Sequence, residues 1–151
     1  MDEIDRKIIG FLARDARASL SSIGSAVGLS VSAVNERIRR LTAAGAIRRT
    51  TVDADPHLLD LPILAFVWIA LAPQADEAAF REYAAAQVAI AECHHVTGPW
   101  SYLIKIHTKS LAGIEDFLAD MKKHGFLSRS ETIIALSSVV QGPFIPKEGM
   151  V

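Results

Sequence analysis

Serine, asparagine and arginine side chains recur at helical spacing after Ser30, and side chains of these types can contact nucleic acid. Guanidinium groups neutralise phosphates, while hydroxyl and amide groups hydrogen-bond base edges in the major groove. One side of the helical wheel is apolar and consists of Val31, Val34, Ile38 and Leu41. The opposite side carries Ser32, Glu36, Arg39 and Arg40, with Asn35 on its flank. This pattern is typical of a helix that enters a major groove.

A second helix and a tight turn are needed to position that helix. Residues 20–27 carry apolar groups at helical spacing, and Gly28-Leu29-Ser30 can end this helix and begin the next. Ser30 suits an N-cap, because its hydroxyl can accept a hydrogen bond from an orphan backbone N–H of the first turn. Four apolar residues predict a third amphipathic helix over residues 1–15: Ile4, Ile8, Phe11 and Leu12. The three helices together indicate a helix-turn-helix unit.

A β-rich run over residues 47–52 follows the helices and indicates a wing that carries two arginines. Residues 37–49 hold five arginines and no acidic residue. The predicted DNA contacts are Ser30, Ser32, Asn35, Glu36, Arg37, Arg39, Arg40, Arg48 and Arg49. From the two helices alone, the alternative of a common helical hairpin with solvated arginines stays open.

The charge of the chain is divided unequally between its two parts. Residues 1–53 have a net charge of +3, whereas residues 54–151 have a net charge of −4. A locally basic first third is consistent with one nucleic-acid module attached to a body with another role.

Length and composition limit the remaining possibilities. The 151 residues are 50% hydrophobic, yet no apolar run reaches the roughly 18 residues needed to cross a bilayer. No signal peptide is expected, because charged residues from Asp2 onward open directly into the first predicted helix. A single cysteine, Cys93, excludes an internal disulfide framework. The sequence therefore predicts a cytoplasmic protein with no membrane partner.

The second part of the chain alternates between strand and helix patterns. The predicted strands are 62–72, 90–97, 100–107 and 132–141, and the predicted helices are 76–88 and 110–123. The order β-α-β-β-α-β is that of a ferredoxin-like module, so the fold class is α+β. The predicted organisation is a winged helix-turn-helix domain (1–53), a linker (54–61), a βαββαβ domain for effector binding and oligomerisation (62–141) and a C-terminal tail (142–151).

Two predicted strands are apolar on both faces. Residues 63–71 and 133–136 contain no polar side chain, although both helices of such a module cover the same face of its sheet. Only residues 142–151 remain after the last strand, so a second copy of the chain is the expected cover. The sequence therefore predicts an obligate homodimer.

The helical stretch IDRKIIGFLARDARASLSSIGSAVGLSVSAVNERIRRLTAAGAIRR and the later stretch AECHHVTGPWSYLIKI resemble the Lrp/AsnC family of transcriptional regulators. The likeness covers almost the whole chain. It implies a sequence-specific DNA-binding regulator whose dimers assemble further, often to an octamer. It also implies modulation by a small effector, commonly an amino acid, near the loop between the second and third strands of the C-terminal module.

That loop departs from the pattern of the family. The family form is glycine, two variable residues, aspartate and an aromatic residue, whereas this chain has Gly98, Pro99, Trp100, Ser101 and Tyr102. These five residues are the predicted effector site. An aspartate could pair with the ammonium group of an amino acid, but the Ser101 hydroxyl can only hydrogen-bond to it. The effector is therefore expected to be different, weakly bound or absent.

Residues near the same loop have side chains suited to other chemistry. Cys93, His94, His95 and His107 have metal-binding side chains, but alternate residues of a strand face opposite sides, so at most Cys93 and His95 share one face. No local signature supports Cys93 as a catalytic nucleophile. The sequence predicts no metal site, no cofactor and no enzymatic activity. An enzyme or stand-alone sensing module, with the helices as an interaction domain, is the alternative class.

Overall fold

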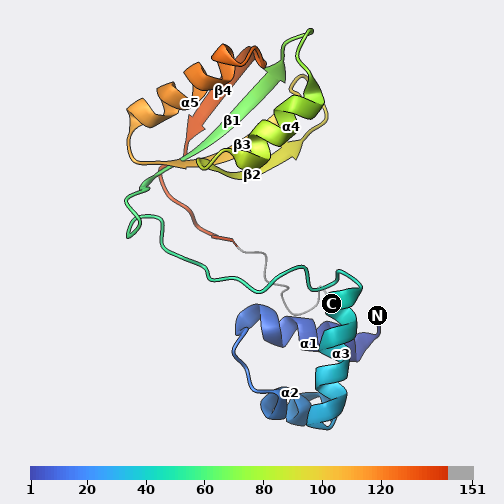
Figure 1. The fold of residues 1–151 in the computed structure, drawn as a ribbon. Helices are drawn as coiled ribbons and strands as arrows, with labels where there is room; N and C mark the ends of the chain where they lie inside the picture. Colours follow the sequence, from blue (N-terminus) through green and yellow to red (C-terminus); the bar gives the residue numbers. More distant parts are fainter. Residues whose placement is uncertain (143–151) are drawn as a thin grey trace. The chain divides into compact units, whose positions relative to one another are not determined.

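A computed structural model describes residues 1–142 of the chain (Figure 1). The chain forms two compact units, one built on residues 1–53 and the other on residues 54–139. Each unit has its own apolar core, so the two are described separately.

The N-terminal unit contains three helices, and each begins at a residue that caps it. The helices are α1 (Glu3–Arg14), α2 (Leu20–Val27) and α3 (Val31–Ala43). The side chains of Asp2, Ser19 and Ser30 accept backbone N–H groups of the first turns of the three helices. The helices pack around a small core of Ile8, Ile23, Val34 and Leu41. The helix-turn-helix prediction and the Ser30 cap are confirmed.

The turn between α2 and α3 depends on two glycines. Gly28 ends α2 with a φ of 71°, in the left-handed region that glycine adopts without steric cost. Gly24 lies against Leu29, whose N–H donates to the Gly24 carbonyl at 2.9 Å. A Cβ added to Gly24 would lie 2.6 Å from the Leu29 carbonyl oxygen. Only glycine therefore allows the turn to approach α2 so closely.

We expect Gly24→Ala to destabilise the helical unit by about 1–3 kcal/mol, because a backbone oxygen cannot move aside as a side chain can. Gly10→Ala is the matched control, since Gly10 lies inside α1 with nothing within 4 Å of an added Cβ. Alanine there should be neutral or stabilising by up to about 1 kcal/mol. Urea unfolding followed by helical circular dichroism measures both. Equal stability of the two variants would contradict the close packing of the turn.

The predicted wing is not found as a strand. Residues 48–53 follow α3 as irregular chain, and Arg48 and Arg49 are exposed. The β-rich composition of residues 47–52 predicted a strand, but a strand needs a neighbouring strand to satisfy its backbone groups. Among residues 1–53, the helical unit provides no such strand.

The C-terminal unit is a four-stranded antiparallel sheet with two helices on one face (Figure 1). Its elements are β1 (Ile63–Leu71), α4 (Glu77–Ala86), β2 (Ile90–His95), β3 (Tyr102–Thr108), α5 (Leu111–Lys123) and β4 (Leu127–Ile134). The strand order β2-β3-β1-β4 confirms the predicted βαββαβ arrangement. Phe80 of α4 and Phe117 and Met121 of α5 pack on the inner residues of β1 and β3, which are Ala65, Val67, Ile69, Ile104 and Ile106.

The opposite face of this sheet is also largely apolar along β1. Leu64, Phe66 and Trp68 alternate with the buried residues of the strand and therefore lie on the face away from the helices. In the antiparallel register, Phe66 lies between Lys105 and Ile133, and Trp68 lies between Leu103 and Glu131. The apolar centre of this open face is thus bordered by charged residues on both neighbouring strands.

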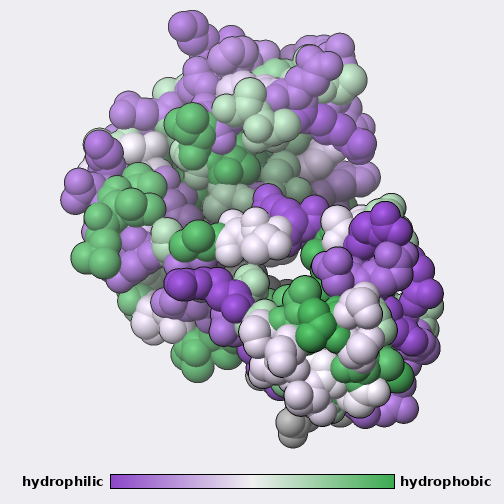
Figure 2. Space-filling view, turned by 60° about the horizontal axis from the view of Figure 1, so that its bottom comes forward, coloured by the Kyte–Doolittle hydropathy of each residue, from purple (hydrophilic) through white to green (hydrophobic). Residues whose placement is uncertain are grey.

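The last strand lies earlier in the chain than predicted. The sequence predicted a strand over 132–141, whereas β4 ends at Ile134. The apolar residues beyond it are instead exposed, with relative accessibilities of 100% for Leu136 and 96% for Val139. Figure 2 shows that hydrophobic residues, in green, also lie on the molecular surface. The predicted tail, 142–151, lies outside the described residues except for Gly142. Within the described part of the chain, no helix is long and apolar enough to cross a membrane.

Candidate nucleic-acid interface

The predicted polar side of α3 is exposed. Eight of the nine predicted DNA-contacting residues are exposed to solvent: Ser30, Ser32, Asn35, Glu36, Arg39, Arg40, Arg48 and Arg49. Three of the four residues of the apolar stripe face the core, since Val34 and Leu41 are buried and Ile38 packs against them, whereas Val31 is 50% exposed. The helix therefore presents hydroxyl, amide and guanidinium groups outward from a rigid three-helix base.

Local contacts already involve some of these exposed groups. The Ser30 hydroxyl accepts the Ala33 N–H at 3.2 Å and lies 3.1 Å from the Ser32 hydroxyl. Arg39 pairs with Glu36 one turn earlier, with an Nη2–Oε2 distance of 2.9 Å, and its side chain is 76% exposed. An exposed pair of this kind contributes little to stability, so Arg39 can exchange Glu36 for a phosphate at small cost.

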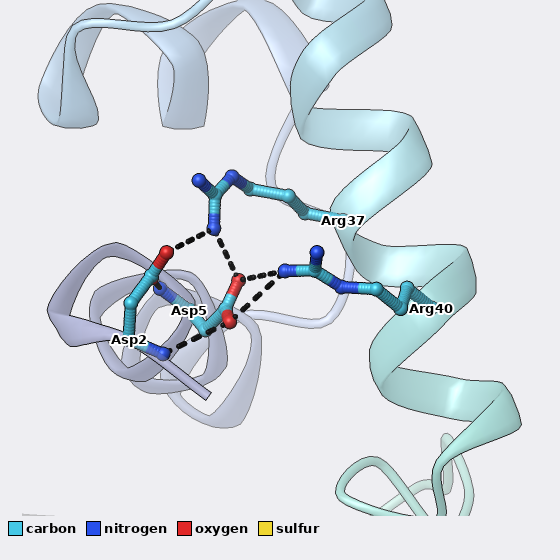
Figure 3. A network of polar contacts seen from close by, with 4 residues as sticks. All are labelled: Asp2, Asp5, Arg37 and Arg40. Atoms are coloured by element: carbon cyan, nitrogen blue, oxygen red, sulfur yellow. Dashed lines mark hydrogen bonds and ion pairs between the residues drawn. The ribbon is translucent and has the colours of Figure 1, made fainter.

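Arg37, by contrast, contacts the first helix (Figure 3). Its Nη1 donates to Asp2 Oδ2 at 2.7 Å and to Asp5 Oδ1 at 2.6 Å. Arg40, one turn further along α3, donates from Nη2 to both carboxylate oxygens of Asp5, at 3.3 and 3.2 Å. The sequence placed Arg37 among the predicted DNA contacts as one of the five arginines of residues 37–49, and it could not show a partner 32 residues away. In the structure, the Arg37 guanidinium group therefore joins α3 to the start of α1.

The network remains charged at neutral pH. Burial raises the pKa of Asp5, but hydrogen bonds from Arg37 and from the Asp2 backbone N–H outweigh this effect and leave the pKa below its usual value. The pKa of Asp2 is also lowered, first by the Asp5 N–H and then by Arg37. The same contacts raise the pKa of Arg37. Asp2, Asp5 and Arg37 are therefore all ionised at the neutral pH at which DNA binding takes place.

The predicted effector loop lies between β2 and β3, and its backbone is tied to β1. The Ser101 N–H donates to the Ile69 carbonyl at 2.7 Å, and the Ser101 hydroxyl accepts the Leu71 N–H at 3.0 Å. The Ser101 oxygen thus already serves a structural hydrogen bond. Gly98 has a φ of 100°, a backbone conformation that residues with a side chain rarely adopt.

The Arg129 side chain lies over the Trp100 ring of this loop. The guanidinium carbon of Arg129, from β4, lies 4.2 Å from the centre of the Trp100 ring. Arg129 Nη2 also donates to the Pro99 carbonyl at 3.2 Å. Sequence reasoning missed Arg129, because strand pairing and not sequence spacing brings it to the loop. The residues from Gly98 to Tyr102 and Arg129 together contain no carboxylate.

Tyr102 points toward the helical layer. Its ring is 4% exposed and packs 4.7 Å from the Phe80 ring, measured between ring centres. Its hydroxyl donates to Glu77 Oε1 at 2.6 Å and accepts from Arg81 Nε at 2.9 Å. An open groove of about 510 Å³ is lined by Arg81 and Tyr102 and also by Cys93 and His95. Tyr102 is therefore a core residue whose polar end reaches a groove.

The cysteine and histidines of β2 do not form a cluster. Cys93 pairs with Ile104 on the helix side of the sheet, whereas the His94 ring lies 3.1 Å from Glu92, away from it. Burial raises the pKa of the Cys93 thiol, which favours the unreactive protonated form. Within the described residues, no three His, Cys, Asp or Glu side chains converge as a metal site would require.

Comparison with known protein families assigns both units. Residues 1–42 match the AsnC-type helix-turn-helix domain, and residues 64–144 match the Lrp/AsnC ligand binding domain. The chain belongs to the Lrp/AsnC family of transcriptional regulators. It is thus a DNA-binding regulator with a helix-turn-helix and a ligand-binding domain, as the resemblance predicted.

Individual relatives support the same assignment. The Bacillus subtilis regulator LrpC is 35% identical over 118 residues, which cover 78% of this chain and 81% of LrpC. Its solved structure covers 94% of this Lrp/AsnC regulator and 99% of LrpC, with a TM-score of 0.85 and 30% identity. The leucine-responsive regulatory protein of Salmonella typhimurium is 36% identical over 80% of this chain and 74% of its own length. A Neisseria meningitidis regulator solved with L-Met shares the fold, at a TM-score of 0.88 and 21% identity, covering 100% of this chain and 99% of its own.

Proposed function

We propose that this Lrp/AsnC regulator reads DNA with the exposed side of α3. The observation that carries the proposal is the outward set of Ser32, Asn35, Glu36, Arg39 and Arg40 on a helix fixed by a packed core. Arg39 and Arg40 would contact phosphates, while the shorter side chains would approach base edges. Arg48 and Arg49, exposed on irregular chain, would add phosphate contacts beside the helix.

Selection of bound duplexes from a random-sequence pool tests this proposal. We expect an enriched sequence with two related half-sites, because a symmetric dimer presents two copies of α3. Recovery of no preferred sequence would contradict sequence-specific recognition by this helix.

The protein acts, in this proposal, as a homodimer built through the C-terminal sheet. Leu64, Phe66 and Trp68 on the open face, and the exposed Leu136 and Val139 beyond β4, are the apolar surfaces that a second copy would cover. The charged border of this face would fix how the two sheets align. Further assembly of dimers, to an octamer, is proposed from the family resemblance.

The proposed effector is a small metabolite bound near the loop from Gly98 to Tyr102. The L-Met complex of the Neisseria relative and the name of the leucine-responsive relative support an amino acid. The loop of this chain lacks a carboxylate for the ammonium group, and the guanidinium group of Arg129, from β4, lies over its Trp100 ring. Weak binding is therefore proposed.

A thermal-shift screen of the twenty amino acids should find at most binding in the micromolar to millimolar range, or roughly −4 to −8 kcal/mol. Ser101→Asp should strengthen it, because a carboxylate can pair with ammonium and still accept the Leu71 N–H. Ser101→Asn is the matched control, being of similar size without the charge. If neither the wild type nor Ser101→Asp responds to any amino acid, the loop has a structural role and the effector proposal fails.

Three further assignments complete the proposal. The protein is not an enzyme, which its membership in a family of regulators supports. It works in the cytoplasm, since its helix-turn-helix must reach DNA. Its helical domain, residues 1–53, is joined through a linker, 54–61, to the effector-binding and oligomerising domain, 62–141.

A further inference from the structure

Asp5 holds a buried negative charge between α1 and α3. Its side chain is 2% exposed, yet both its oxygens accept hydrogen bonds, from Arg37, from Arg40 and from the Asp2 N–H. A buried carboxylate is tolerated only when it is paired and hydrogen-bonded. A shift of α3 along α1 would strain or break these hydrogen bonds, so the network favours the observed placement of α3 on α1 (Figure 3).

Arg40 links this network to the outer surface of α3. Its side chain is 61% exposed although Nη2 is held by Asp5. Among the described residues, its other guanidinium nitrogens donate no hydrogen bond. Since the guanidinium group is planar and rigid, fixing one nitrogen also limits the direction in which the others point. Arg40 can thus face a phosphate in an orientation set from beneath by Asp5.

The two aspartates also lower the positive charge of this surface. α3 carries three arginines, and two of them are bound to Asp2 and Asp5. Attraction to any DNA depends on the net positive charge that meets the phosphates. The network therefore weakens sequence-independent attraction while it fixes the geometry needed for base contacts.

We propose that Asp5 is a positioning residue for DNA recognition, which fixes α3 on α1 through Arg37 and orients Arg40 toward the DNA backbone. This role rests on the proposed reading of DNA by α3. It assigns Arg37 to the support of the interface and not to the interface itself.

The test compares Asp5→Asn with the wild type, as full-length proteins, on a duplex selected by the wild type and on a scrambled duplex of the same composition. Affinity for the selected duplex should fall about tenfold, comparable with the cost of one mismatched base pair. Affinity for the scrambled duplex should stay equal or rise, because the surface gains positive charge. A role in stability alone would lower both affinities together.

Two further variants keep the test decisive. Asp2→Asn retains the N-cap of α1 but removes one of the two carboxylates that bind Arg37. The ratio of its affinities for the selected and the scrambled duplex should therefore fall, by a smaller factor than for Asp5→Asn. This variant also tests the proposal if Asp5→Asn does not fold. Asp15→Asn is the matched control, with the same charge change at the other end of α1 and its bond to the Arg17 N–H preserved. It should leave the preference unchanged.

Two failures can be told apart. A wild type that does not prefer its selected duplex would overturn the proposed reading by α3. A wild type with a clear preference that Asp5→Asn and Asp2→Asn both retain would overturn the positioning role of Asp5 alone.

Discussion

Replacement of Arg39 and Arg40 by alanine should weaken binding to every duplex by roughly one to two orders of magnitude at low salt. Both side chains are more than half exposed on the polar side of α3, and neither contributes to the core. If both bind phosphates, the slope of log affinity against log salt should become shallower by about one unit for each phosphate that is no longer neutralised. Fluorescence anisotropy across a salt series measures the affinity and the slope together.

The matched control removes two positive charges elsewhere. Lys122 and Lys123 lie in the last turn of α5, in the C-terminal unit, so their replacement by alanine gives the same change in net charge. This control should bind DNA with nearly the wild-type slope. If the Arg39 and Arg40 variant kept the affinity and slope of the wild type, the exposed side of α3 would not be the DNA-contacting surface.

Trp68→Asp should yield insoluble or unfolded protein rather than soluble monomer. Trp68 lies at the centre of the open sheet face, between Leu103 and Glu131. In a symmetric dimer, the substitution places two unpaired charges in the interface, each costing about 3–5 kcal/mol and each beside Glu131 of its own chain. Solubility on expression and light scattering after size exclusion measure the effect.

Val88→Asp provides the control for this substitution. Val88 is 97% exposed and follows α4 outside the sheet, so aspartate there should leave the dimer unchanged. A soluble, well-folded Trp68→Asp monomer would contradict the view that the open face requires a second copy for stability.

The sequence predicts most of the fold because local rules decide most of its elements. Apolar periodicity and the serine cap define α3, and the uninterrupted apolar run defines β1. The sequence predicted β4 too late in the chain because β4 is an edge strand. Its polar residues Ser128, Arg129, Ser130 and Glu131 lack the apolar pattern that is typical of a buried strand. The apolar residues that followed it seemed to be the strand, but they extend beyond the sheet into solvent.

The site residues are less predictable because tertiary contacts decide their roles. A helical wheel shows which way Arg37 points, but it cannot show that Asp2 and Asp5 bind it. The spacing of Asp2 and Asp5 at the start of α1 does suggest the capping box that the structure contains. Likewise, the sequence does not show that the Ser101 hydroxyl already accepts a hydrogen bond from the Leu71 N–H of β1.

The salt dependence of DNA binding by the intact protein tests the central claim most directly. We expect binding to its selected duplex at low salt and a steep loss as salt rises, with a log–log slope of about −0.9 for each phosphate neutralised. Binding that does not change with salt, or no binding to duplex DNA at low salt, would contradict a regulator that reads DNA with the arginine-bearing side of α3.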